Sequence, residues 1–140
     1  MSSRVDIAAQ QLGRRIREER RRQSLDQRTL AAYAPATALG INMHLVWTGV
    51  ARVLSERGDT SLDWVLEDAA AGELFAFGNS EGGNDLVLFD SLTTAVAGAE
   101  GSYSFTGTKI FTSLAPAWTR LGIFGRDGDR LVHGFITRDT

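Results

Sequence analysis

The chain has 140 residues, of which 43% are hydrophobic, and its formal net charge at pH 7 is −2. This composition suits one ordinary folded domain or two small ones, and it argues against intrinsic disorder. The absence of cysteine excludes disulfides and thiolate metal sites and is compatible with a reducing compartment. No secretory signal or apolar run of membrane-spanning length is recognised, so the sequence predicts a cytoplasmic protein without a membrane partner.

The charged residues are unevenly distributed along the chain. Residues 4–28 carry eight arginines and four acidic residues, a net charge of +4. Residues 56–100 carry ten acidic residues and one arginine, a net charge of −9. A solvated basic helix followed by an acidic surface explains this pattern. A basic arm that binds a polyanion is the alternative interpretation.

The first half of the chain has helical patterns. Residues 4–22 place apolar residues at helical spacing among charged ones, which predicts a helix. Another helix is expected at Ser61–Ala71, where Thr60 and Asp63 have the spacing of a capping box and Gly72 supplies the stop.

Between these two segments, Ala34–Arg57 is predicted to form a long helix. Pro35 suits its first turn and Gly58 suits its C-terminal end. His44 has apolar neighbours on this helix and is interpreted as a packed histidine. The apolar residues recur at steps of three, four and one, which predicts a single apolar face. This face consists of Leu39, Met43, Val46, Val50, Val53 and Leu54.

After Gly72 the pattern changes to strands and turns. Gly98–Gly101 predicts a hairpin connection, and Asp127-Gly128 predicts a second tight turn. The expected strands are Leu74–Asn79, Leu92–Ala97, Tyr103–Ser113, Leu121–Gly125 and Leu131–Thr137. The predicted fold class is therefore α+β. An N-terminal helical segment, residues 1–72, precedes an incomplete antiparallel β-barrel-like middle domain, residues 73–140.

Two segments of the predicted β domain have the composition of a ligand-binding site. Phe75–Asp85 runs from an apolar strand into a glycine-rich loop, whose backbone N–H groups can approach a flat ligand closely. Gly107–Leu114 is expected to continue a strand in which Lys109, Phe111 and Ser113 share one face. An aromatic ring beside a hydroxyl can support a planar heterocycle and hydrogen-bond its edge. Taken singly, the first segment is equally well explained as a plain turn and the second as a half-buried strand.

Taken together and in this order, the two segments resemble the acyl-CoA dehydrogenase family. The first reads Ser-Glu-Gly-Gly-Asn-Asp from Ser80, where the family has Thr-Glu-Pro-Gly and a following Gly-Ser-Asp. The second reads Gly-Thr-Lys-Ile-Phe-Thr-Ser from Gly107, where the family has Gly-x-Lys-x-Trp-Ile-Thr-Asn. The resemblance extends from about Gln27 to Arg138. It implies FAD-dependent oxidation of an acyl-CoA to the 2-enoyl-CoA, a reaction of fatty acid metabolism.

The resemblance implies that four residues contact FAD. Ser80 corresponds to a threonine that bonds the flavin ring, and Asn84 corresponds to the serine that precedes the aspartate. Phe111 replaces a tryptophan that packs on the flavin, and Ser113 corresponds to a threonine that bonds its edge. The loop departs from the family pattern, because Gly82 replaces a proline and the loop is shorter, which affects the placement of Asn84.

The family's catalytic base is a glutamate in a C-terminal helical bundle, which also completes the flavin site and the oligomer. No such bundle is recognised here, so no residue is assigned as catalytic and none as a metal ligand. The glutamates excluded as the base are Glu56, Glu67, Glu73, Glu81 and Glu100. The chain is expected to be a fragment that is inactive alone. It is expected to bind an acyl-CoA as a homo-oligomer or together with a complementing C-terminal half.

Two alternatives remain at this stage. Flavin monooxygenases related to the acyl-CoA dehydrogenases activate oxygen on the same scaffold. Residues 11–33 resemble the first two helices of a helix-turn-helix repressor, which would make the chain a DNA-binding protein. The mostly apolar Pro35–Trp47 then follows where a polar recognition helix is expected, so the main interpretation includes no nucleic acid partner.

Overall fold

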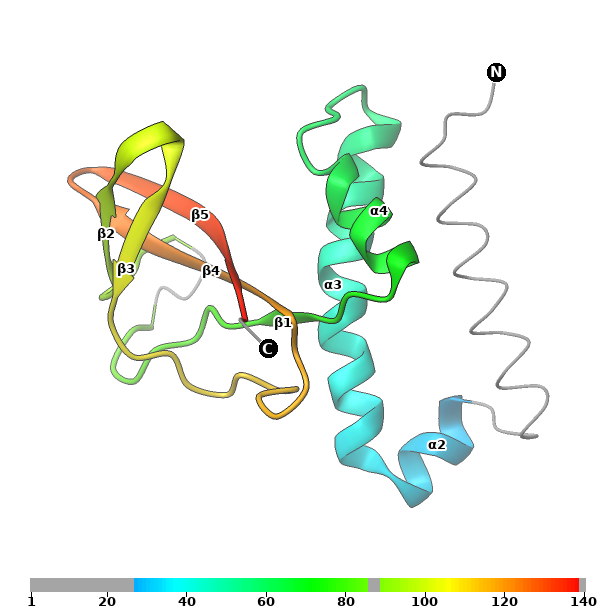
Figure 1. Ribbon diagram of the computed structural model, residues 1–140. Helices are drawn as coiled ribbons and strands as arrows, with labels where there is room; N and C mark the ends of the chain where they lie inside the picture. Colours follow the sequence, from blue (N-terminus) through cyan, green and yellow to red (C-terminus); the bar gives the residue numbers. More distant parts are fainter. Residues whose placement is uncertain (1–26, 86–88, 139–140) are drawn as a thin grey trace. The chain divides into compact units, whose positions relative to one another are not determined.

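A computed structural model of the chain describes residues 27–85 and 89–138. The fold is α+β, as the sequence predicts, with helices followed by a five-stranded sheet (Figure 1). The chain divides into two compact units, the first ending at Phe75 and the second beginning at Ala76. The helix expected at residues 4–22 lies outside the described residues, as does most of the segment that resembles a helix-turn-helix.

Three described helices belong to the first unit: α2 (Gln27–Tyr33), α3 (Pro35–Glu56) and α4 (Asp63–Ala71). Pro35 occupies the first turn of α3, and Gly72 ends α4 in a left-handed conformation with φ 110°, both as predicted. The predicted capping box is wrong, because no side chain caps α4. The Asp59 carboxylate instead accepts a hydrogen bond from the Ser61 amide. None of the described helices is long and apolar enough to cross a membrane.

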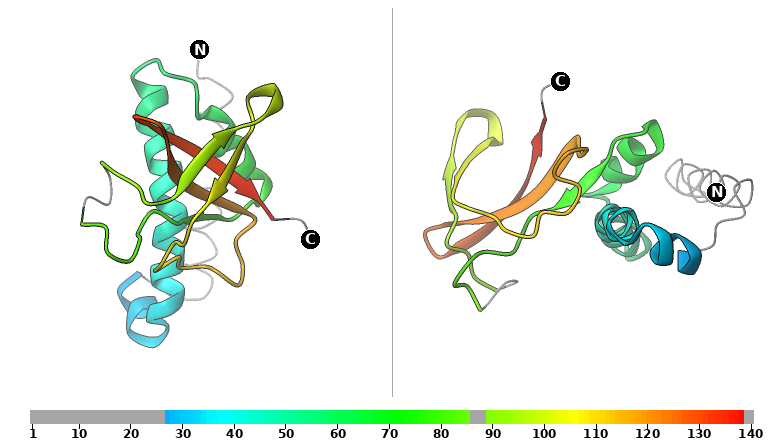
Figure 2. Two further views of the ribbon diagram at one scale, coloured as in Figure 1. Left: turned by 90° about the vertical axis from the view of Figure 1, so that its left-hand side faces the viewer. Right: turned by 90° about the horizontal axis from the view of Figure 1, so that it is seen from below.

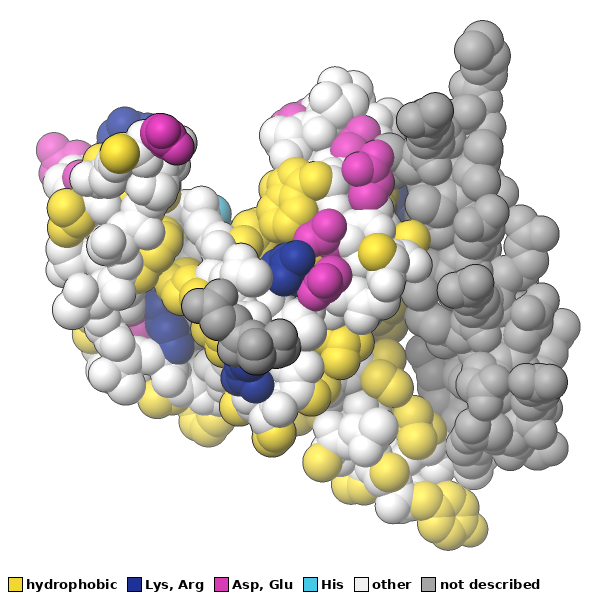
Figure 3. Space-filling view, in the orientation of Figure 1, with side chains coloured by type: hydrophobic (Ala, Val, Ile, Leu, Met, Phe, Trp, Pro, Cys, Tyr) yellow, Lys and Arg dark blue, Asp and Glu magenta, His cyan; other side chains and the backbone are white. Residues whose placement is uncertain are grey.

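Helix α3 leaves the predicted apolar face partly exposed and buries another face. Leu39, Val50 and Val53 of the predicted face remain 50%, 41% and 48% exposed. Figure 3 shows exposed hydrophobic side chains over α2 and the adjoining end of α3. Periodicity identifies the apolar face of the helix, but it cannot decide whether that face or a neighbouring face of smaller residues packs within the unit. The buried positions recur at steps of four, three and four residues: Gly40, His44, Trp47 and Ala51.

His44 is the polar residue in the buried face of α3. Its side chain is 8% exposed, and its Nδ1 accepts a hydrogen bond of 3.1 Å from the backbone N–H of Phe75. The ring of Phe75 lies between two other rings, with centroids 5.9 Å from His44 and 6.1 Å from Trp64. The interpretation of His44 as a packed histidine is confirmed. Burial lowers the pKa of its imidazole below the usual value.

The sheet contains five strands: β1 (Phe75–Phe77), β2 (Thr94–Ala97), β3 (Tyr103–Thr106), β4 (Arg120–Asp127) and β5 (Arg130–Thr137). Strands β2 and β3 form a hairpin through a short 3₁₀ turn at Ala99–Gly101, as the glycines around it predict. Strands β4 and β5 form a second hairpin, whose turn contains Gly128 with φ 57°, as the Asp-Gly pair predicts. Figure 2 shows the two hairpins crossing each other.

The prediction of an antiparallel, barrel-like domain is wrong. The strand order is β1-β4-β2-β3, with β5 also paired to β4, and the sheet does not close. Strand β2 runs parallel to β4 through the pair Thr94 and Arg126, so the sheet is mixed. A parallel pair needs a long return connection, which residues 107–119 provide. An alternating sequence pattern contains no information on such a return.

The strand expected at Tyr103–Ser113 ends at Thr106. Its partner strand β2 begins at Thr94, which pairs with Thr106, so no β2 backbone continues the ladder beyond this point. At Gly107 the chain passes close to Thr93, the residue just before β2. A Cβ at position 107 would lie 2.8 Å from the Cα and Cβ atoms of Thr93. The argument that Lys109, Phe111 and Ser113 share one strand face is therefore wrong.

The burial of His44 predicts that the stability of the first unit depends on pH. Because folding lowers this pKa from 6.5, the unfolded chain takes up the proton more readily, and stability falls as pH drops through 6.5. Urea unfolding followed by tryptophan fluorescence at pH 7.5 and 5.5 measures this slope. His44→Gln, which keeps an acceptor without a titrating group, should flatten it. An unchanged slope in this variant would contradict the assignment.

The exposed apolar face of α3 predicts self-association. Val50 and Ile41 are both partly exposed, and because they are nine positions apart in a helix, they lie about 180° from each other around its axis. Val50→Glu should reduce the average mass measured by sedimentation at high concentration, because a charge would enter the contact. Ile41→Glu is the matched control on the opposite side and should leave the mass unchanged. A wild-type chain that remains monomeric throughout would count against the prediction.

Candidate functional site

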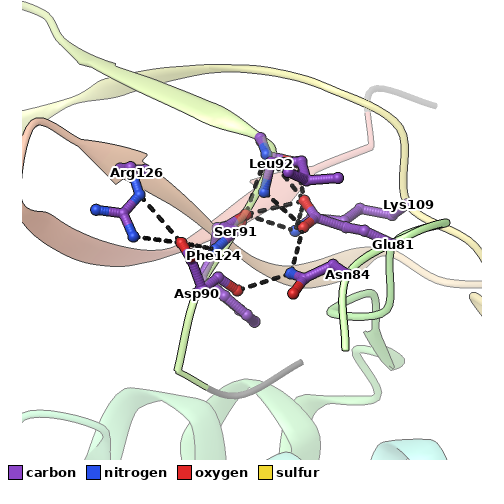
Figure 4. A network of polar contacts seen from close by, with 9 residues as sticks. Glu81, Asn84, Asp90, Ser91, Leu92, Lys109, Phe124 and Arg126 are labelled. Atoms are coloured by element: carbon purple, nitrogen blue, oxygen red, sulfur yellow. Dashed lines mark hydrogen bonds and ion pairs between the residues drawn. The ribbon is translucent and has the colours of Figure 1, made fainter. Parts of the chain in front are cut away.

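The glycine-rich segment after β1 is organised by a buried carboxylate. The Glu81 side chain is 2% exposed, although it lies in a loop between two exposed glycines and a half-buried serine. A buried carboxylate must be hydrogen-bonded or paired with a cation, because its transfer from water is costly. Glu81 satisfies both requirements (Figure 4).

Six donor atoms from the described residues surround the Glu81 carboxylate. Four of them bond Oε1, at distances between 2.6 and 2.9 Å. Two bond Oε2, at 2.7 and 2.9 Å. They come from the same loop, from the entry to β2 and from the segment after β3, so one side chain joins three parts of the second unit. The donors are Ser91 Oγ, the Thr93 amide and hydroxyl, Lys109 Nζ, the Leu92 amide and Asn84 Nδ2.

These donors keep the carboxylate charged. Burial by itself would raise the pKa of Glu81, but the bonds from Lys109, Thr93, Leu92 and Asn84 outweigh it and hold the pKa far below the usual range. A general base near neutral pH needs a pKa close to the working pH. The low pKa of Glu81 and its six donors therefore suit it to anchoring the loops.

Lys109 is the cation of this cluster. Its ammonium lies 2.8 Å from Glu81 Oε1, its side chain is 10% exposed, and it stands 4.5 Å from the ring centroid of Phe124. The ring of Phe124 is fully buried in β4 and stacks on His133 with centroids 5.1 Å apart. Burial, together with the nearby Lys109 charge, lowers the pKa of His133. The Glu81–Lys109 pair therefore packs directly against the core of the sheet through Phe124.

A second ion pair extends the cluster towards the surface. Arg126 bonds the Asp90 carboxylate through Nε at 3.0 Å and through a further guanidinium nitrogen. The Arg126 bonds, followed by the Ser91 amide, lower the pKa of Asp90. Asn84 joins the two pairs, since its amide nitrogen donates both to Glu81 and to the Asp90 carbonyl.

The long segment between β3 and β4 presents an aromatic ring to solvent. Phe111 is 83% exposed and has a φ of 56°, in the left-handed region that residues other than glycine, asparagine and aspartate seldom adopt. Leu114 has a similar φ of 70°. The amide of Ile110 donates a hydrogen bond of 2.8 Å to the carbonyl of Ser80, which joins this segment to the glycine-rich loop.

The four residues expected to contact FAD have different settings. Ser80 and Ser113 are half-buried, and Phe111 is exposed. Ser80 lies next to Ile110 through the backbone bond described above, and the Ser113 amide bonds the Phe111 carbonyl at 2.9 Å. Asn84 differs from the other three, because its amide nitrogen is engaged within the cluster.

The sequence contains a signal for the cluster that its interpretation missed. Lys109 is the only charged residue between Glu100 and Arg120, whereas Glu81 lies in the acidic stretch of residues 56–100. A lone cation in a segment that becomes partly buried is expected to pair with an acid. The prediction of a strand in the second segment conceals this pairing, because it places the Lys109 side chain on one face of the sheet and names no partner for it.

No group of three or more metal-ligating side chains is found in the part of the chain that the structure describes. Asn79, which follows β1, is 2% exposed, and its Oδ1 has no hydrogen-bond partner among the described residues.

Comparisons of the chain with protein-family models, with curated proteins and with solved structures found no match.

The Glu81–Lys109 pair predicts a strong effect on stability. Lys109→Met should lower the free energy of unfolding by about 3–5 kcal/mol at pH 7, because a buried charge would lose its partner. Arg126→Met breaks the more exposed pair with Asp90 and should have a much smaller effect, because solvent screens it. Chemical denaturation of both variants measures the difference. Equal losses would show that Glu81 is more solvated than described.

Acid should weaken the same cluster. The folded pKa of Glu81 is below its ordinary value of 4.5, so its stabilisation is complete above that pH and is lost as pH falls below it. The stability of Glu81→Gln should therefore change less between pH 5 and pH 3 than that of the wild type, as measured by urea unfolding. Parallel curves for the two proteins would contradict the assigned pKa direction.

Proposed function

We propose that this chain contributes the flavin-contacting surface of an FAD-dependent oxidoreductase of the acyl-CoA dehydrogenase type. The observation that carries the proposal is the contact between the two segments on which the resemblance rests. Lys109 of the second segment bonds Glu81 of the first, and Ile110 bonds Ser80. Segments that supply one binding site must lie together, and these two do so although 28 residues separate Glu81 from Lys109.

The setting of Phe111 supports an aromatic ligand. A left-handed backbone at such a residue costs on the order of 1–3 kcal/mol, and such conformations cluster at functional sites. The exposed ring recovers none of this cost by burial in the chain itself. A planar heterocycle stacked on the ring would do so, and offset stacking adds roughly 0.5–1.5 kcal/mol beyond the buried area.

In this proposal Ser80 and Ser113 supply the hydroxyl groups that bond the edge of such a ring. The backbone bond between Ile110 and Ser80 brings the glycine-rich loop beside the segment that carries Phe111 and Ser113. Gly82 and Gly83 are exposed and leave the loop open to a large ligand. Asn84 supports the loop from inside in this proposal, since its amide nitrogen bonds Glu81 and the Asp90 carbonyl.

In the proposed reaction, a bound flavin would supply the hydride acceptor for oxidation of an acyl-CoA to the 2-enoyl-CoA. The residues of this chain hold and orient the ring, with Phe111 against its face and the two serine hydroxyls at its edge. The resemblance places the base in a helical bundle, either in a complementing half or in an oligomer. A related flavin monooxygenase on the same scaffold is the alternative. Acyl-CoA-dependent dye reduction by the chain joined to a complementing C-terminal half would distinguish the two activities.

Titration of the ¹⁵N-labelled chain with FAD up to millimolar concentration tests the proposal. We expect weak binding, with amide shifts concentrated at residues 80–84 and 110–113. Phe111→Ala should weaken binding by about 0.5–1.5 kcal/mol, and Phe111→Trp should retain it, because indole offers an equal ring face. Ser113→Ala should remove one hydrogen bond, worth roughly 0.5–1.5 kcal/mol.

The stability of the free chain is the control for this titration. Because the ring of Phe111 is exposed, Phe111→Ala should leave the free energy of unfolding within about 0.5 kcal/mol of wild type. A core role for Phe111 would instead lower stability with and without FAD. Shifts spread over the whole chain, or none at millimolar FAD, would overturn the proposed function.

A further inference from the structure

We infer that the buried Glu81–Lys109 pair is a positioning device, which sets the place of the Phe111-bearing segment relative to the glycine-rich loop. The inference concerns how the chain presents this ring, so it holds for any planar ligand and does not rest on the identity of the cofactor. Glu81 and Lys109 are positioning residues in this inference and touch no ligand themselves.

The segment that carries Phe111 has no strand to hold it. After Thr106 the β2–β3 ladder ends, and no regular structure is present until β4 begins at Arg120. A connection of this length needs specific contacts to adopt one conformation. At its beginning these contacts are the close approach of Gly107 to Thr93 and the bond from Lys109 to Glu81.

The far end of the segment is held separately. Arg138, just after β5, donates a hydrogen bond of 2.6 Å to the Ala115 carbonyl and lies 3.9 Å from the ring centroid of Trp118. Its amide also bonds the Thr119 carbonyl. Phe111 therefore lies between two anchored points. Before it stand the Ile110 backbone bond to Ser80 and the buried pair of Lys109, and after it stand the Arg138 contacts.

The chemistry of the pair favours a role in position. An apolar replacement of a buried ion pair is often as stable as the pair itself, so stability alone is a weak reason for its presence. A charged group with many donors accepts only one arrangement, because any shift leaves a buried charge or donor without a partner. Here the same carboxylate oxygen, Oε1, bonds both Lys109 and Thr93, which places the segment after β3 against the entry to β2.

Pulsed EPR distances can test this inference directly. The chain has no cysteine, so Phe111→Cys and Val96→Cys introduce the only two labelling sites. Both positions are exposed, and Val96 lies in β2 as a fixed reference. With the pair intact, the distribution of label distances should be narrow. Lys109→Met should broaden it about twofold or more.

The double variant Glu81→Gln/Lys109→Met separates position from stability. Removing both charges should restore part of the stability that Lys109→Met loses, since no uncompensated buried charge remains. The distance distribution should nevertheless stay broad. Val132→Ala, a half-buried position in β5, is the control for general destabilisation and should keep it narrow. A narrow distribution in the double variant would overturn the inference, even if its stability is reduced.

Hydrogen exchange on the unsubstituted chain gives a second test, which holds even if the variants do not fold. The Ile110 amide bonds the Ser80 carbonyl only while the two segments are in place. Its exchange should be slowed to within roughly tenfold of amides in β3. Exchange as fast as in an unprotected loop would refute the inference and leave the proposed flavin contact to be judged by the FAD titration alone.

Discussion

The second unit depends on the buried charge of Glu81. A carboxylate with 2% side-chain exposure is tolerated only because six donors, one of them the Lys109 ammonium, surround it, and those donors come from three segments that are distant in the chain. Each segment has little regular structure near the contact. The loop after β1, the entry to β2 and the segment after β3 are therefore held together by the contacts of one buried charge.

The same constraint explains why an exposed aromatic ring can have a defined place. The Phe111 ring is 83% exposed, so little packing holds it, and its left-handed backbone conformation is energetically unfavourable. Fixed neighbours on both sides compensate for this, with Lys109 and Ile110 before it and the Arg138 contacts after it. In the proposed function, such a surface is arranged before the flavin arrives, which would lower the entropic cost of binding.

In the helical unit, the size of the side chains does not decide which face of α3 is buried. Its buried face is formed by small and polar residues around one tryptophan, whereas several larger aliphatic residues of α3 remain partly exposed. Close packing at Gly40 and Ala51 and the hydrogen bond of His44 to Phe75 distinguish the face that packs within the unit. The aliphatic face is then available for contacts with other helices, as the association experiment tests.

The sequence by itself determined the α+β class, the long helix after Pro35, the left-handed end of α4 at Gly72 and both hairpin turns, because propensity, proline and glycine act over a few neighbouring residues. It also singled out the two segments that meet in the second unit. Only the tertiary structure decided which face of α3 is buried, that β2 and β4 run parallel, and that the strand before Phe111 ends at Thr106. Each of these outcomes depends on a contact between residues far apart in the chain. The pairing of Glu81 with Lys109 is of the same kind, since the free energy of burying a charge is set by the partners that the fold brings to it.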